Sequence, residues 1–231
     1  MTVVSQYHRP ATLHDALELL SREGSAVLAG GTGVNAGQRT TAALLVDLQA
    51  LGLEGVHVTD DGALVVGATT RLSELARKEL PSALRTLATV GGTLVAGGWE
   101  SALVAGLLAC DAVVATVDRE GTAELRLAVL LADPDLIAGR IITAVRLNTT
   151  GTASVHTTAR TTADRPIVAC IARHTATGVR VAMSGVAATP VVVDDVEQLA
   201  PPGDFRGSAD YRHHLARVLR TRALIELGAD S

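Results

Sequence analysis

A run of glycines directly after an apolar stretch most constrains the fold of this chain. In Val27–Asn35, with the sequence VLAGGTGVN, apolar residues give way to glycines and a threonine, which predicts a strand that ends in a tight loop. Glycine adopts positive φ, and its main-chain N–H approaches a ligand without an intervening Cβ. Successive N–H groups in such a turn form a concave site suited to phosphate. A strand-to-helix turn with no ligand explains the same pattern.

A second glycine pair lies in Thr89–Thr93, with the sequence TVGGT, again between apolar stretches. Two glycine loops, each flanked by threonine, are able to hold the two halves of one pyrophosphate. Neither is a Walker A sequence, because no Gly-Lys-Ser/Thr follows, and the first lacks the third glycine and the acidic residue of the Rossmann fingerprint. The pair therefore predicts a site outside the usual dinucleotide folds.

Composition indicates a globular chain with an aliphatic core. The 231 residues are 48% hydrophobic and 19% charged, but aromatic residues make up only 2%, so few rings are available to stack on a base or a flavin. A net charge of −4 without a basic stripe argues against nucleic-acid binding. Cys110 and Cys170 lie far apart, which argues against an iron–sulfur cluster or a structural zinc within this chain.

Location follows from the same features. Two free thiols fit a reducing cytoplasm, and the first ten residues lack the apolar core of a signal peptide. The most apolar run, residues 102–117, is interrupted by Asp111 and is too short to span a bilayer. We expect a cytoplasmic protein with no membrane insertion.

The first fifty residues predict a small β-α-β unit. Thr12 is the expected N-cap of a helix whose apolar face carries Leu13, Leu17 and Leu20. Strands are expected at 26–29 and 44–48, so the glycine loop follows the carboxyl end of a strand, where open α/β sheets usually bind ligands.

The remaining pattern predicts alternating short strands and helices. Strands are expected at 56–58, 64–67, 113–117, 125–127, 141–147, 166–172 and 179–186. Helices are expected from Thr70 as cap through Leu75, at 80–87, at 103–108 and after Ser208 as cap. The Thr- and Gly-rich residues 148–153 predict a boundary.

Several of these segments, in this order, resemble the flavoprotein (medium) subunit of the molybdenum hydroxylases, the carbon monoxide dehydrogenase and xanthine dehydrogenase family. The resemblance covers nearly the whole chain. It rests on segments 7–10 (YHRP), 28–33 (LAGGTG), 45–48 (LVDL), 67–75 (GATTRLSEL), 89–92 (TVGG), 184–190 (SGVAATP) and 207–212 (GSADYR).

The resemblance implies an α+β fold in three parts. Residues 1–51 and 52–148 would form the two subdomains of an FAD-binding fold of the vanillyl-alcohol oxidase and UDP-N-acetylenolpyruvoylglucosamine reductase type. Residues 153–231 would form a small C-terminal α+β domain like that of carbon monoxide dehydrogenase flavoproteins, with three antiparallel strands and helices.

The resemblance also implies a function. The chain would be an oxidoreductase component that binds FAD and passes electrons between iron–sulfur centres and an external acceptor, with a molybdopterin-binding large subunit and an iron–sulfur small subunit as partners. It implies no catalytic acid or base and no metal in this chain. The residues expected to hold the FAD pyrophosphate are Ala29, Gly30, Gly31, Thr32, Gly33, Val34, Thr89, Gly91 and Gly92.

The chain departs from the family pattern around the flavin ring. Thr93 stands where asparagine is usual, Ala102 where an acidic residue is usual, and Val155 and Thr157 where an aromatic and a basic residue are usual. These departures leave two alternatives open, a cofactor-free structural subunit that keeps the fold and a stand-alone flavin oxidoreductase. Near the second motif, Trp99 is interpreted either as a cover for the cofactor or as a partner-facing or half-exposed residue.

Overall fold

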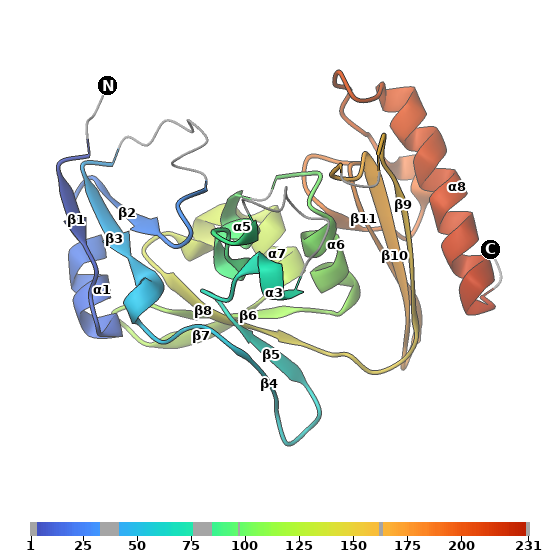
Figure 1. Cartoon of the computed structure of the whole chain (residues 1–231). Helices are drawn as coiled ribbons and strands as arrows, with labels where there is room; N and C mark the ends of the chain where they lie inside the picture. The colour runs from blue at the N-terminus through green and yellow to red at the C-terminus, as the bar shows by residue number, and fades with distance from the viewer. Residues whose placement is uncertain (1–3, 33–41, 76–84, 97, 162–163, 230–231) are drawn as a thin grey trace.

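The computed structural model of the chain describes residues 4–32, 42–75, 85–96, 98–161 and 164–229. Within these ranges, three sheets follow one another along the sequence (Figure 1). In the view of Figure 1, the N-terminal sheet lies at the left, the central sheet runs beneath a group of helices, and the C-terminal sheet lies at the right beside a long helix.

The N-terminal sheet is parallel, as expected from a β-α-β unit. Its elements are β1 (Gln6–His8), α1 (Leu13–Leu20), β2 (Ser25–Leu28) and β3 (Leu44–Asp47), and β3 is the central strand. Thr12 caps α1, because its hydroxyl accepts a hydrogen bond from the N–H of Asp15 at 3.1 Å. The apolar face of α1 then packs on β3 in a small cluster around the fully buried Ala16 and Val46.

The central sheet is antiparallel and has the order β4-β5-β8-β6-β7. Its strands are β4 (Val56–Val58), β5 (Leu64–Gly67), β6 (Val113–Val117), β7 (Thr122–Arg126) and β8 (Ile141–Leu147). The helices of this part are α3 (Leu72–Leu75), α5 (Val90–Ala96), α6 (Ala102–Ala109) and α7 (Leu127–Ala132). Residues of all four helices join the middle strands in one core, which includes the fully buried Val114 and Val145.

The C-terminal sheet lies between two helices. Its antiparallel strands, in the order β12-β11-β10-β9, are β9 (Ala153–Thr158), β10 (Val168–Thr175), β11 (Gly178–Ser184) and β12 (Val191–Val192). One face packs on α8 (Ala209–Leu227), which Ser208 caps as expected. The other face packs on α6, which is apolar on all sides and comes from the preceding part of the chain. Side chains of β10 therefore alternate between two cores.

Several details differ from the expectations. The expected loop at Thr89–Thr93 is wrong, because Val90 begins α5. The strand expected at 125–127 ends at Arg126, and Leu127 begins α7. Thr70 does not cap a helix, since its hydroxyl is hydrogen-bonded to the main chain of Gly55. The C-terminal sheet has four strands, whereas the sequence pattern predicts two of them and the resemblance implies three. Most of the helix expected at 80–87 lies outside the described residues.

Burial of Cys170 leads to a first prediction. This thiol lies in the core between the C-terminal sheet and α8, and burial raises its pKa to about 12. At pH 8 only about one thiol in ten thousand would then be ionised. We expect Cys170 to resist iodoacetamide at pH 8 in the folded protein and to react in denaturant, as measured by peptide mass spectrometry. Rapid alkylation of the folded protein would contradict this packing.

Candidate functional site

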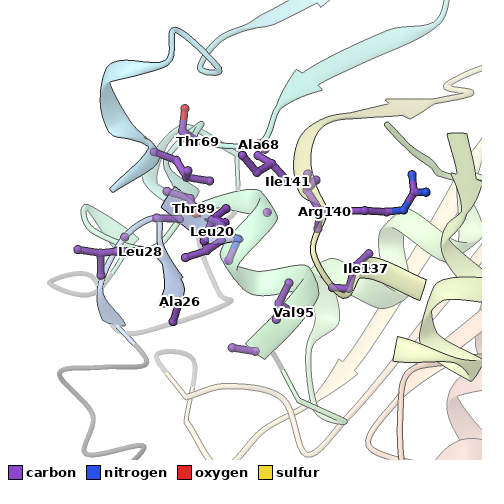
Figure 2. Close-up of a pocket in the computed structure, with 18 of the residues that line it drawn as sticks. Leu20, Ala26, Leu28, Ala68, Thr69, Thr89, Val95, Ile137, Arg140 and Ile141 are labelled. Atoms are coloured by element: carbon purple, nitrogen blue, oxygen red, sulfur yellow. Dashed lines mark hydrogen bonds between the residues drawn. The ribbon is translucent and has the colours of Figure 1, made fainter. Parts of the chain in front are cut away.

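A pocket of about 490 Å³ lies where the N-terminal sheet meets α5 and the start of β8. In Figure 2, Ala26 and Leu28 of β2 lie on one side of the pocket, and Ile137 and Arg140, which precede β8, lie on the other. Thr89 and Val95 bring the beginning and the end of α5 to the wall between them. The pocket is therefore built by both of the first two sheets and by their connections.

The first glycine motif forms part of this wall. Ala29, Gly30, Gly31 and Thr32 line the pocket, whereas Gly33 and Val34 lie outside the described residues. Gly31 has φ of 72°, in the left-handed region that glycine adopts without steric cost. Among the described residues, no hydrogen bond is donated by the N–H of Gly30 or of Gly31. These amides are the type of donor that an anionic ligand accepts from.

The first glycine motif is in direct main-chain contact with the residues that precede the second. A Cβ placed on Gly30 would lie 2.0 Å from the carbonyl oxygen of Leu87 and 3.0 Å from the Cα of Ala88. No side chain fits in that space, so only glycine permits the first motif to approach the segment that leads into the second. This contact marks the closest approach of the two walls.

The second motif supplies Thr89, Gly91 and Gly92 to the pocket wall. Its amides are already engaged, because the N–H of Gly91 donates to the carbonyl of Ala68 at 2.8 Å and that of Gly92 donates to the Thr89 hydroxyl at 3.2 Å. A distance of 3.2 Å lies at the long end of the usual range for N–H···O hydrogen bonds. The second motif thus offers close approach and a replaceable cap, while the first offers unused donors.

Thr69 is a pocket residue that pattern reasoning missed as a ligand candidate. Thr69 lines the pocket and is 5% exposed, and its hydroxyl has no hydrogen-bond partner among the residues that the structure describes. Buried hydroxyls are nearly always paired, since an unpaired one costs about 1–3 kcal/mol. The segment that contains Thr69 belongs to the sequence resemblance, but the unpaired state of its hydroxyl is visible only in three dimensions.

The charge around the pocket is compatible with an anion. None of the described residues that line it carries a carboxylate. Arg140 lies on the wall, but its guanidinium extends away from the pocket in Figure 2 and pairs with Asp118 at 2.5 Å. In the described part of the chain, no cluster of His, Cys, Asp or Glu is placed to hold a metal ion.

Trp99 and Glu100 belong to a buried ion-pair cluster. The guanidinium of Arg212, which is fully buried, lies 4.4 Å from the centre of the Trp99 ring and 3.1 Å from a carboxylate oxygen of Glu100. It also donates to Asp204 at 2.7 Å. These contacts join α8 to the segment before α6, where Ser101 is the N-cap.

The positions that depart from the family pattern are spread over the structure. Thr93 lies in α5 and Ala102 begins α6, while Val155 and Thr157 lie on the exposed side of β9. None of the four lines the pocket described above. Thr93 lines a second, smaller pocket of about 210 Å³ together with Trp99 and Pro190.

Comparison with known proteins identifies the family. A model of the FAD-binding domain in molybdopterin dehydrogenases matches residues 3–149. The chain belongs to this family. The expectations of a flavoprotein of the molybdenum hydroxylase type, of FAD as its cofactor and of an oxidoreductase component are thereby confirmed.

Proteins that are similar in sequence or in structure match almost the whole chain. The uncharacterised protein YgfM of Escherichia coli K12 is 32% identical over 250 aligned positions, which cover 94% of each chain. A chain of quinoline 2-oxidoreductase from Pseudomonas putida 86 superposes with a TM-score of 0.85 at 19% identity, and one of the Cu,Mo-CO dehydrogenase with 0.83 at 22% identity. Each of these two structural matches covers 98% of both chains, which confirms the expected α+β fold.

Proposed function

We propose that this chain is the electron-transfer subunit of a multi-subunit molybdenum hydroxylase and passes electrons between iron–sulfur centres and an external acceptor. Its partners would be a molybdopterin-binding large subunit and an iron–sulfur small subunit. The observation that carries the proposal is the pocket of about 490 Å³ with glycine motifs on its wall and an unpaired hydroxyl, in a chain of an FAD-binding family. FAD supplies the redox chemistry, because its ring takes up and releases electrons singly or in pairs.

The residues of the pocket have separate roles in this proposal. The N–H groups of Gly30, Gly31 and Thr32 and the hydroxyl of Thr69 would donate to the pyrophosphate, whose oxygens accept charge-assisted hydrogen bonds. Ala29 and Val34 would shape the first loop around them, with Gly33. Thr89, Gly91 and Gly92 would close the opposite wall, where the absence of side chains permits close approach.

The proposal includes the organisation of the chain and its location. Division into residues 1–51, 52–148 and 153–231 is supported by the three successive sheets and by the family match, which ends at residue 149. No helix of the described part has the length and apolar character needed to cross a membrane. A reducing cytoplasm is supported by two cysteines without a disulfide.

The decisive experiment is the visible absorption spectrum of the protein purified from its native host, with identification of any flavin released on denaturation. One FAD per chain, together with co-purifying iron–sulfur and molybdenum subunits, is the expected result. A colourless protein that takes up no added FAD would overturn the proposal and favour a cofactor-free structural subunit. Steady turnover of a small substrate by the isolated chain would favour a stand-alone flavin oxidoreductase.

Replacing Thr69 tests the pocket directly. In the Thr69→Val variant the unpaired hydroxyl is lost but the side-chain volume is kept, so we expect unchanged or slightly higher stability of the apoprotein. FAD binding is expected to weaken by about ten- to a hundredfold, the value of one hydrogen bond to a charged group. Titration of the apoprotein followed by flavin fluorescence measures this loss.

The matched control is Thr175→Val, at the end of β10, where the hydroxyl donates to the carbonyl of Gly178 at 2.9 Å. This variant should lower stability slightly and leave FAD affinity unchanged. Equal FAD affinity in Thr69→Val and the unmodified protein would show that the Thr69 hydroxyl does not contact the cofactor.

A further inference from the structure

Two polar side chains connect the main chain of the first glycine motif to the segment that leads into the second. The side-chain amide of Gln49 donates to the carbonyl oxygen of Ala29 at 2.9 Å, and its oxygen accepts from Arg71 at 2.7 Å. Arg71 in turn donates to the carbonyl oxygen of Leu87. A continuous set of three hydrogen bonds thus runs from the residue before Gly30 to the residue two before Thr89.

We propose that Gln49 and Arg71 form a brace that sets the spacing of the two glycine motifs and thereby the affinity for the pyrophosphate of FAD. The inference rests on the proposed function, because it concerns the same pocket. Neither residue lines the pocket, so both act through the main chains that they hold. They are positioning residues.

Each end of the brace is itself held in place. Gln49 lies in a short 3-10 turn, Leu48–Ala50, and its N–H donates to the carboxylate of Asp47 at 2.9 Å. Asp47 is buried at the end of β3. At the other end, the main chain of Arg71 forms a bridge with Thr89, and the next N–H, that of Leu72, donates to Ala88 at 2.9 Å. The brace therefore holds the end of β3 in a fixed position relative to the beginning of α5.

The chemistry of the brace requires an amide in its middle. Gln49 donates to a carbonyl and accepts from a guanidinium with one planar group, and glutamine has both functions at this length. A glutamate carboxylate at position 49 would still accept from Arg71, but its other oxygen would face the carbonyl oxygen of Ala29, and neither of these oxygens is able to donate. Precise spacing matters here because the motifs already touch at Gly30, and a ligand held from two sides loses affinity when either side moves.

The test measures FAD affinity and thermal unfolding of the apoproteins of Gln49→Met, Arg71→Met and the double variant. We expect about a tenfold loss of FAD affinity for each single variant. The FAD affinity of the double variant should be no lower than that of the weaker-binding single variant, because either substitution alone already interrupts the brace. Gln49→Glu should resemble Gln49→Met, since it cannot donate to Ala29.

Control variants remove similar groups far from the pocket. Gln198→Met removes a side chain that donates to Asp195, and Arg217→Met breaks an exposed ion pair with Glu197. Both should keep the FAD affinity of the unmodified protein.

Each other outcome has one meaning. Full FAD affinity in Gln49→Met with a lower melting temperature would overturn the brace and assign these contacts to stability alone. If the two losses of FAD affinity multiply in the double variant and Arg71→Met causes the larger one, the brace is overturned. Arg71 would then attract the phosphates directly. Failure of the unmodified protein to bind FAD would overturn the proposed function as well, which separates the two conclusions.

Discussion

Gly30→Ala is expected to abolish measurable FAD binding. The added Cβ would lie 2.0 Å from the carbonyl oxygen of Leu87, so the two glycine motifs must separate before the methyl group fits. Forcing atoms into a packed site costs about 1–3 kcal/mol of unfolding free energy. The pyrophosphate would be affected more strongly, because it would lose contacts on both walls at once, and we expect FAD affinity to fall more than about a hundredfold. Titration of the apoprotein with FAD measures the effect.

Two other glycines provide controls for this prediction. A Cβ on Gly106, within α6, meets no described atom within 4 Å outside the backbone of its own helix, so Gly106→Ala should bind FAD normally and gain stability, as alanine does in helices. A Cβ on Gly92 would lie 3.0 Å from the Thr89 hydroxyl, which can rotate away, so Gly92→Ala should have an intermediate effect. Equal FAD affinity in Gly30→Ala and Gly106→Ala would show that the contact of the motifs is not needed for binding.

Arg212→Met is expected to cause the largest loss of stability. Arg212 is fully buried, it is paired with Glu100 and Asp204, and it donates to the carbonyl of Ile167. Methionine would fill most of the volume but leave two carboxylates without this partner. Removing one partner from a buried charge cluster costs about 3–5 kcal/mol, which corresponds to a melting temperature lower by about 10 °C in a chain of this size. Calorimetry of the apoprotein measures it.

An exposed arginine gives the matched comparison. Arg217 pairs with Glu197 on the surface, where both side chains are about half exposed, so Arg217→Met should cost less than about 1 kcal/mol. A similar loss in both variants would contradict the assignment of Arg212 as a link between α8 and the segment before α6.

Acid should weaken the same cluster. Burial alone would raise the pKa of Asp204, but hydrogen bonds from Arg212 and from the main-chain N–H groups of Arg206 and Gly207 outweigh it and hold this pKa below its ordinary value. A carboxyl whose pKa is lowered on folding stabilises the protein above its unfolded pKa of about 4, and the contribution is lost as pH falls through the lower folded value. The difference in stability between Arg212→Met and the unmodified protein should therefore shrink in this acidic range.

Local chemistry explains which parts of the fold could be predicted from the sequence. The caps Thr12 and Ser208 were correct because a hydroxyl before an apolar repeat acts within one turn. The strand β1 was missed because it has three exposed residues and no alternation of burial. The helix α5, which begins at Val90, was missed because glycine is a poor helix former. Hydrogen bonds to Ala68 and Thr70, which are distant in sequence, hold its first turn.

Tertiary contacts explain which parts of the site could not be predicted from the sequence. The glycine motifs are visible as a sequence pattern, but the roles inferred for Thr69, Gln49 and Arg71 depend on atoms that folding brings together. The pair of Glu100 and Arg212 spans 112 residues, and no spacing rule relates charges that far apart. Proposed contacts at Gly33 and Val34 remain predictions, because these residues lie outside the described ranges.

The position of α6 bears on how such a chain can be recombined. This helix precedes the Thr- and Gly-rich boundary at 148–153, yet it covers one face of the C-terminal sheet, and Arg173 of β10 donates to its last carbonyl, that of Ala109, at 2.8 Å. A chimera joined at residue 150 would pair the sheet of one parent with the α6 of the other, across a packed apolar surface. The two packed surfaces of a chimera would match only if α6 and the C-terminal sheet come from the same parent, which requires a crossover before Glu100.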